Sequence, residues 1–316
     1  MPQGNSDIVA RLTDRLRPKA KSLIITVYGD AIAHHGGNAW LGSLIELVEP
    51  LGMNERMVRT SVFRLAKEGW LVAQPIGRRS YYRLTEAGQR RFDAAHIRIY
   101  RHAQRPWDKG WTVVVPVASL GPEARDTLRR DLGWLGFGLL PGGVMLHPDP
   151  DEAALRALLD GGPGPAAMVV RGAAPPWGGS DAVAEVIRGC WDLGRLAEDY
   201  AGFLDTFRPV WQALKDAPAL DPRLCFCVRT LLMHGYRRAL LRDPMLPDEL
   251  LPGDWPGAAA RVLCRNLYRL TEAAAERHVE ATLETPDGPV PGATAAYFTR
   301  FGGLRGQVEE AAASAI

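Results

Sequence analysis

The sequence predicts an α+β protein of several domains, with a basic N-terminal module, a central mixed unit and a helical C-terminal domain. Three observations lead to this prediction. Two short amphipathic helices and a basic hairpin occupy the N-terminal region, strands and helices alternate over residues 111–171, and long amphipathic helices follow residue 181. With 316 residues, 47% of them hydrophobic, the chain is long enough for two or three domains with their own cores.

Residues 54–69 predict a helix with two different faces. On a helical wheel Val58, Val62 and Leu65 gather on one side, while basic, polar and aromatic residues gather on the other. Asn54 is a suitable N-cap, and Gly69 suits the left-handed conformation that ends a helix. One face therefore packs on a core and the other faces an anion. The candidate DNA contacts on this helix are Arg56, Arg59, Thr60, Phe63, Arg64 and Lys67.

The segments on either side of this helix indicate its role. Residues 41–51 predict a short helix that ends a few residues earlier, which is helix-turn-helix spacing. Residues 70–85 predict two strands around a turn at Gly77, and a basic hairpin after the second helix is typical of a wing. A winged helix-turn-helix domain is thus expected at residues 19–88, the alternative being a structural helical hairpin with a solvated face. The hairpin adds the candidates Arg78, Arg79 and Tyr81.

The charge distribution favours double-stranded DNA as the partner. Residues 1–109 carry a net charge of +8 and residues 110–316 a net charge of −6, which together give the +2 of the whole chain. Lysine and arginine contacts to phosphates are salt-sensitive and independent of sequence. Arg56, Thr60 and Arg64 are the side chains able to reach base edges. Phe63 either meets a thymine methyl group or packs beneath the hairpin.

Two further helices are expected in the N-terminal third. The first spans residues 18–34, offers an apolar stripe to the other helices, and stops at Gly36. The second runs from residue 85 to about residue 102 and is rich in arginine, including Arg101. We expect residues 89–109 to form a linker helix that leads out of the DNA-binding domain.

Residues 110–173 predict a compact ferredoxin-like domain with the order β-α-β-β-α-β. The expected strands are residues 111–117, 137–140, 144–147 and 167–171, and the expected helices are residues 122–132 and 152–159. Small nucleases associated with CRISPR loci share this order, but phosphodiester hydrolysis needs clustered carboxylates around a metal. The first strand ends without an acidic residue, so a structural or dimerising domain is the better interpretation.

The remainder of the chain predicts a helical domain at residues 181–284. A linker rich in Pro and Gly at residues 173–180 precedes it, and helices are expected at residues 182–214, 223–241 and 257–283. The proline-rich segment 242–257 is too apolar for a flexible tether and predicts an ordered loop. Residues 285–316 contain several Pro and Gly and predict a poorly ordered tail.

Composition argues against several other classes. No apolar run approaches membrane-spanning length and no signal peptide is apparent, so a cytoplasmic protein is expected. The four cysteines form no C-x-x-C pair and are expected to be reduced. The histidines, including His34, His35, His96 and His102, lack carboxylates or thiols at ligand spacing. We expect no metal, no cofactor and no catalytic residues.

Several of these segments resemble one known family. The runs SLIITVYGDAI, VRTSVFRLAKEGWL, WTVVVP and especially HGYRRALLRDPMLPDELLPGDWPG are similar to the phenylacetate-degradation repressors, the PaaX family, over residues 19–283. The resemblance implies a winged helix-turn-helix domain, a central ferredoxin-like domain and a helical C-terminal domain. It also implies a homodimer that represses aromatic catabolic genes at an operator and responds to an aryl-CoA thioester, such as phenylacetyl-CoA.

An aryl-CoA effector needs cations for its phosphates and an apolar slot for its acyl group. The predicted helix at residues 223–241 and the following loop offer such groups, although ion pairs from Arg237 and Arg242 to Asp243 or Asp254 would equally explain these cations. The candidate effector contacts are Arg229, His234, Tyr236, Arg237, Arg238, Arg242 and Trp255.

Three other functions stay open at this point. An enzyme acting on CoA thioesters would use His234 as a base, but Cys225 and Cys227 lie about 10–14 Å away along a helix, too far for direct proton transfer. The second alternative is a DNA-binding regulator that responds to a different ligand. A DNA-organising protein without an effector would show weak sequence preference.

Overall fold

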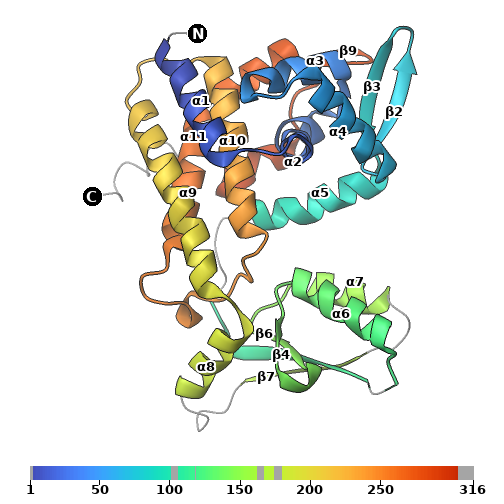
Figure 1. Ribbon diagram of the computed structural model, residues 1–316, viewed down its shortest axis with the longest axis vertical. Coiled ribbons are helices and arrows are strands. Elements are labelled where there is room, and N and C mark those ends of the chain that lie inside the picture. The colour runs from blue at the N-terminus through green and yellow to red at the C-terminus, as the bar shows by residue number, and fades with distance from the viewer. Residues whose placement is uncertain (1–2, 101–105, 118, 162–166, 174–179, 305–316) are drawn as a thin grey trace. The chain divides into compact units, whose positions relative to one another are not determined.

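The computed structural model describes residues 3–100, 106–117, 119–161, 167–173 and 180–304, and these residues form two compact units (Figure 1). The first unit comprises residues 1–103, 201–238 and 258–316, and the second comprises residues 104–200 and 239–257. The N-terminal module and most of the C-terminal helices therefore belong to one unit. Arg101, most of the expected linker at residues 173–180 and the last twelve residues lie outside the described residues.

The chain of the first unit begins with α1 (Gln3–Leu16), a helix that sequence periodicity did not suggest. Helix α2 (Ala20–Val27) then widens into a π-helical turn at Tyr28–Ile32, and a 3-10 turn continues to His35. Gly36 takes a φ of 85° and ends the helical segment where the sequence predicts a stop. The π-helical turn carries Asp30 into the interior, where it is 2% exposed.

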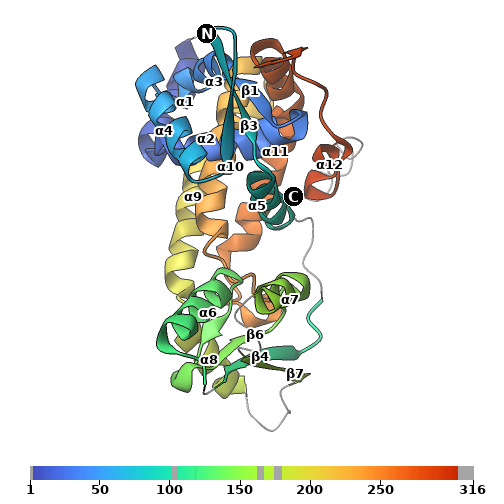
Figure 2. The same cartoon turned by 90° about the vertical axis from the view of Figure 1, so that its right-hand side faces the viewer.

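Helices α3 (Leu41–Val48) and α4 (Glu55–Lys67) form the predicted pair. Gly52 turns the chain between them with a φ of 80°, and the Asn54 side chain caps α4 by accepting a hydrogen bond of 2.9 Å from the Met57 amide. The apolar face of α4 packs on α2 and α3 (Figures 1 and 2). Val58 and Val62 are fully buried there, as the sequence predicts.

A three-stranded antiparallel sheet accompanies these helices. It has the order β1-β3-β2, with β1 (Asn38–Trp40), β2 (Leu71–Ile76) and β3 (Arg79–Leu84). Strands β2 and β3 form the predicted hairpin, and Gly77, with a φ of 59°, makes its tight turn possible. Figure 1 shows this hairpin projecting beyond the helices. Helix α5 (Glu86–Ile99) follows, capped by the Thr85 side chain.

Three long helices follow later in the chain: α9 (Leu193–Leu214), α10 (Pro222–Leu240) and α11 (Pro256–Thr282). Helices α10 and α11 lie close to the expected bounds, but the single helix expected at residues 182–214 is divided into α8 (Ser180–Cys190) and α9. Helix α10 is amphipathic only in part, since Phe226, Val228, Leu231 and Leu232 are fully buried on several of its sides.

The expectation of a poorly ordered tail is wrong for residues 285–304. Strands β8 (Glu284–Thr285) and β9 (Gly288–Pro289) pair, and α12 (Ala295–Phe298) and a 3-10 turn follow. Tyr297, Arg300 and Phe301 are at most 1% exposed. The Pro and Gly content indicated flexibility, but burial of these side chains within the first unit holds the segment in place.

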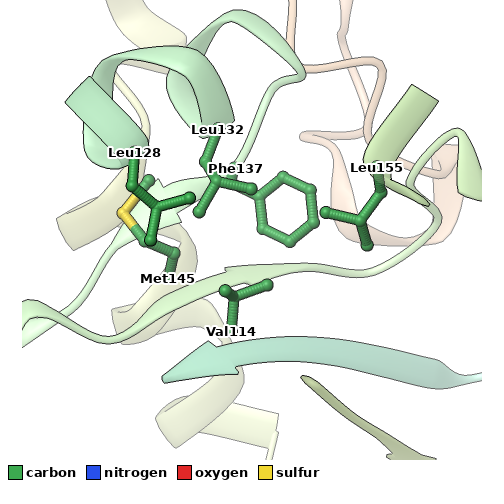
Figure 3. Close-up of a cluster of buried hydrophobic side chains, with 6 residues drawn as sticks. All are labelled: Val114, Leu128, Leu132, Phe137, Met145 and Leu155. Carbon is green, nitrogen blue, oxygen red and sulfur yellow. The ribbon is translucent and has the colours of Figure 1, made fainter. Parts of the chain in front are cut away.

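The second unit contains a four-stranded antiparallel sheet with the order β5-β6-β4-β7. The elements follow the predicted order: β4 (Gly110–Pro116), α6 (Pro122–Trp134), β5 (Gly138–Leu139), β6 (Met145–His147), α7 (Glu152–Asp160) and β7 (Ala167–Ala173). Val114, Leu132 and Phe137 meet in the core between sheet and helices (Figure 3). Strand β7 forms one edge and leaves Met168, 57% exposed, on the surface.

The proline-rich segment after α10 is an ordered loop, as predicted, and it belongs to the second unit. Leu246 is 1% exposed and packs with Trp111 and with Ile187 of α8 (Ser180–Cys190). The Tyr200 hydroxyl donates a hydrogen bond of 2.5 Å to the Asp243 carboxylate, which fixes the start of the loop. No described helix is long and apolar enough to cross a bilayer.

Candidate nucleic-acid interface

Helix α4 presents a basic, solvent-facing side opposite its buried side. Arg56, Arg59, Thr60, Arg64 and Lys67 are all exposed. Phe63 is 58% exposed, which resolves the alternatives for this residue: it does not pack beneath the hairpin. The side chains that the sequence assigns to DNA contact on this helix therefore face solvent together.

These basic side chains differ in the interactions that they form with neighbouring side chains. Arg59 forms an ion pair of 2.6 Å with Glu55, one helical turn earlier. The Lys67 ammonium lies 5.3 Å from the centre of the Phe63 ring. Arg56 and Arg64 form no ion pair with any described residue. Their charges are therefore the most available to an anionic partner.

The three candidates on the hairpin have three different environments. Arg78 lies exposed in the turn. Arg79 stacks on Trp40, with its guanidinium carbon 4.2 Å from the ring centre, and pairs with Glu284 at 2.5 Å. Tyr81 is only 6% exposed and faces the core, because alternate residues of β3 point to opposite sides. The structure thus contradicts a direct DNA contact by Tyr81, and its role is to support the hairpin.

We define the basic surface as the six exposed residues that remain available: Arg56, Thr60, Phe63, Arg64, Lys67 and Arg78. It combines four positive charges with one hydroxyl group and one aromatic ring. Arginine side chains on an exposed helical face can hydrogen-bond to phosphates and to base edges in the major groove of duplex DNA. The arrangement is therefore suited to binding a nucleic acid.

The candidate effector contacts on α10 are mostly buried. Arg229 is fully buried, His234 is 3% exposed and Tyr236 is 2% exposed. Arg237 is partly buried and donates a hydrogen bond of 2.7 Å to the Thr26 hydroxyl. Arg238 is exposed and donates to the backbone carbonyl of Leu16 at 3.3 Å. Arg229, His234 and Tyr236 are thus core residues rather than surface ligands.

The two remaining candidates lie in the loop of the second unit. Arg242 pairs with Asp199 at 3.1 Å, and the Trp255 ring lies 5.9 Å from the ring of Tyr200. The expected ion pairs from Arg237 and Arg242 to Asp243 or Asp254 are not formed, because Asp243 accepts from Tyr200 and Arg242 reaches α9 instead. Arg242 therefore fastens the loop to α9.

A buried ionic network in the first unit was missed at the level of sequence. Asp30 pairs with Arg229 at 3.0 Å and with Arg300 at 3.3 Å, and Arg229 also pairs with Glu276 at 2.6 Å. The hydroxyl groups of Tyr100 and Tyr268 donate to Asp30 at 2.5 and 3.0 Å. The network joins the π-helical turn to α5, α10, α11 and the C-terminal segment.

The pKa shifts within the network indicate stable charges. Burial opposes ionisation of Glu276, but Arg229 and His35 lower the pKa of its carboxyl group to about 2. Burial likewise opposes protonation of His35, but hydrogen bonds to Glu276 and to the Pro291 carbonyl raise the pKa of this histidine. Glu276 therefore contributes stability above its ordinary pKa near 4.5 and loses it only as the pH falls toward 2.

Three other histidines are held neutral. Burial lowers the pKa of His34 to about 3 and the pKa of His96 to about 4, with Arg300 adding to both shifts. Burial, followed by the charge of Arg237, lowers the pKa of His234 to about 4. Each group adds stability above its ordinary pKa of 6.5, and this stability is lost as the pH falls toward 4.

We expect the free energy of unfolding to fall between pH 6.5 and pH 4.5, before the ionic network titrates. Each unit of pKa depression corresponds to about 1.4 kcal/mol. His234→Asn should therefore reduce the loss of unfolding free energy on acidification by about 2–3 kcal/mol. Urea unfolding of the wild type and the variant at pH 7.5 and 4.5 measures the difference. An equally steep fall in the variant would show that His234 does not carry the effect.

The described residues offer no site for metal or thiol chemistry. They contain no group of three or more His, Cys, Asp or Glu that could hold a metal ion. All four cysteines are free, and burial raises the pKa of Cys225 to about 11 and of Cys227 to about 12. The thiols of Cys225 and Cys227 therefore stay protonated at neutral pH and are poor nucleophiles.

Comparisons with known proteins give consistent matches along the chain. Family models match in sequence order: the PaaX-like protein at residues 19–88, the PaaX protein central Cas2-like domain at residues 104–174 and the PaaX-like protein C-terminal domain at residues 191–281. The transcriptional repressor PaaX of Escherichia coli K12 is 40% identical over 285 residues, which cover 90% of each chain. Among solved structures, an uncharacterised protein from Mycobacterium tuberculosis is 26% identical, with a TM-score of 0.49, over 81% of this chain and 98% of that one.

These matches agree with the resemblance found in the sequence. The protein is a mixed structure of helices and sheets, and the matched family models divide the chain into N-terminal, central Cas2-like and C-terminal PaaX domains. The chain belongs to the PaaX family of transcriptional repressors, and it is a regulator rather than an enzyme.

Proposed function

We propose that this protein represses an aromatic, phenylacetate-type catabolic operon by binding its operator DNA as a cytoplasmic homodimer, and that an aryl-CoA thioester such as phenylacetyl-CoA releases it. The observation that carries the proposal is the basic surface. On it Arg56 and Arg64 of α4 form no ion pair with a described residue, and Arg78 in the hairpin turn is also exposed. The family relationship supports the same function.

In this proposal residues 19–88 act as a winged helix-turn-helix domain. Helix α4 enters the major groove, with Arg56, Thr60 and Arg64 directed at base edges. The exposed position of Arg78 in the hairpin turn suits a contact with the phosphate backbone or the minor groove. Lys67 adds a phosphate contact, and Phe63 is available to a thymine methyl group.

The homodimer places two such domains on an inverted repeat. The central domain, residues 110–173, is the proposed ferredoxin-like dimerising domain, and the helical domain at residues 181–284 follows it. The linker helix expected at residues 89–109 is shorter than predicted, because α5 ends at Ile99 and residues 106–109 are not helical. The edge strand β7 of the central domain supports the dimerising role, since Met168, Val169 and Val170 are 57%, 42% and 47% exposed. An apolar, unpaired strand edge is a ready surface for a second copy.

The effector acts by favouring a conformation in which the two recognition helices no longer match the spacing of the half-sites. Only a difference in affinity between the two conformations is required. A cation for an anionic effector is available at Arg237. The charge of Arg229 is already compensated within the protein, and the exposed Arg238 donates a hydrogen bond to the Leu16 carbonyl. A different effector ligand remains the alternative within the same mechanism.

The test is binding to promoter DNA from the protein's own gene neighbourhood at fixed salt, with phenylacetyl-CoA, free CoA or no addition. Release by the thioester but not by CoA supports repression and the effector class together. If the protein binds the DNA tightly and neither compound releases it, the result supports the repressor function and rejects an aryl-CoA thioester as the effector. Absence of salt-sensitive DNA binding would reject the proposal.

The hairpin gives a separate prediction. Arg78→Ala should weaken binding to specific and non-specific DNA alike and reduce the slope of log K against log[salt] by about 1, because one phosphate contact is lost. Arg79→Ala should change the slope less, since Glu284 and Trp40 already engage Arg79. Fluorescence anisotropy at several salt concentrations measures both slopes. Equal slopes for the two variants would contradict the assignment of Arg78.

A further inference from the structure

The first unit contains a pocket whose lining includes Trp70, which follows the proposed recognition helix α4. It lies among α2, α5 and α10, which are neighbours in Figures 1 and 2, and its volume is about 430 Å³, counting the part open to solvent. Trp70, Phe92 and Tyr100 form aromatic walls, and Ile25 and Met233 add aliphatic ones. This mainly aromatic and aliphatic lining is typical of a site for a small organic ligand or for one end of a larger ligand.

The pocket also contains a cation, Arg237, that forms no ion pair with a described residue. The Arg237 guanidinium donates a hydrogen bond to the Thr26 hydroxyl. Asp30, which also lines the pocket, already pairs with Arg229 and Arg300. A guanidinium group that has lost part of its hydration without gaining a carboxylate is costly, and an anionic or strongly polar ligand oxygen would offset this cost.

The aromatic wall is held in a defined position. A Cβ atom at Gly29 would lie 2.8 Å from a ring carbon of Phe92, so the ring rests directly against the backbone of the π-helical turn. Phe92 meets Trp70 edge to face at 5.5 Å, and the Arg91 guanidinium stacks on Trp70 at 4.8 Å. Tyr100 is fixed by its hydrogen bond to Asp30. Such a wall is already formed before a ligand arrives.

We propose that this pocket binds an aryl-acyl group, with the ring against Phe92 and Tyr100 and the acyl oxygen at Arg237. This inference rests on the proposed function, because it gives the effector of the repressor a site. Both a free aryl carboxylate and an aryl-CoA thioester carry the required group. The residues involved are mostly not those that the sequence assigned to the effector, since the site takes its walls from α2 and α5 as well as α10.

The position of the pocket suggests how a bound ligand changes the affinity of the protein for DNA. Helix α2 provides one wall and packs on the recognition helix α4. Helix α5 provides another wall and follows directly on the hairpin strand β3. A ligand that binds better when α2 and α5 stand further apart shifts the relation between α4 and the hairpin. The ligand therefore needs no contact with DNA to change its affinity.

The test is calorimetric titration of the full-length protein with phenylacetyl-CoA, sodium phenylacetate and free CoA. Two variants address the pocket: Arg237→Met keeps the side-chain length without the charge, and Ala95→Leu fills the space between the walls. Arg238→Met is the matched control, because Arg238 is exposed on the same helix and bonds only the Leu16 carbonyl among described residues. Circular dichroism melts confirm that each variant is folded.

The inference predicts that at least one aryl-acyl probe binds the wild type, that Arg237→Met and Ala95→Leu each weaken binding at least tenfold, and that Arg238→Met stays within twofold. Comparison of phenylacetate with its thioester identifies the natural form of the group. If both pocket variants bind the aryl-acyl probe with wild-type affinity, the pocket is not the binding site, although the proposed effector class still holds. Binding of neither aryl probe to the wild type would overturn the inference, and DNA binding measured in parallel would show whether the repressor function survives.

Discussion

Asp30→Asn is expected to lower the free energy of unfolding by about 3–5 kcal/mol, the cost typical of removing one partner from a buried ion pair. The substitution keeps the shape of the side chain but removes its charge. Arg229 and Arg300 are both at most 1% exposed. Arg229 would keep its ion pair with Glu276, but Arg300 would lose its ion pair with Asp30. Tyr100 and Tyr268 would also donate to a neutral oxygen in place of a carboxylate.

Urea unfolding at pH 7.5 measures this loss, and Asp93→Asn is the matched control. Asp93 is exposed on α5 and accepts a hydrogen bond from Gln89 alone among the described residues. Its substitution should change stability by less than about 0.5 kcal/mol. The double variant Asp30→Asn, Arg300→Met should recover part of the loss, because it restores the charge balance. A loss below about 1 kcal/mol in the single variant would contradict the network's role.

The network also means that the DNA-binding module is not an independent body. Asp30 belongs to the N-terminal region, yet its partners Arg229 and Arg300 lie about 200 and 270 residues further along the chain. Likewise, Glu284 from the C-terminal part of the chain forms an ion pair with Arg79 of the hairpin. Both contacts lie within one compact unit, so the C-terminal helices and the last described segment hold the DNA-reading elements in position.

Features determined by neighbouring residues could be predicted from sequence. The bounds of α4 followed from its period, from the Asn54 cap and from Gly69, which takes a φ of 72°. The hairpin followed from two β-rich runs around Gly77. The order of strands and helices in the central domain followed from the same kind of local signal, which needs no knowledge of distant partners.

Features that depend on distant partners could not be predicted. Nothing in the sequence near Asp30 indicates that two arginines from far along the chain will bury with it. The tail was misjudged because Pro and Gly content does not reveal that Tyr297 and Phe301 will be buried. Tyr81 was misplaced because Tyr81 and Tyr82 are adjacent, and a shift of one residue decides which of two neighbours faces the core.

Arg56→Ala is expected to weaken operator binding by about 1–3 kcal/mol, roughly 5- to 150-fold, while affinity for unrelated DNA falls much less. Arg56 is the second residue of α4, and the first residues of a recognition helix are the ones that reach base edges. It is exposed and has no ion pair with a described residue, so its guanidinium group is available for a bidentate contact with guanine. Relaxed preference at one base pair should accompany the loss.

Arg59 provides the control on the same helix, because its charge is already compensated by Glu55 at 2.6 Å. Arg59→Ala should therefore cost less than about threefold on either DNA, in line with the small value of an exposed ion pair. Competition binding with operator variants and unrelated duplex at one salt concentration separates the cases. If Arg56→Ala weakened both DNAs equally, Arg56 would contact a phosphate, and base recognition would have to come from Thr60 and Arg64 one and two helical turns further along α4.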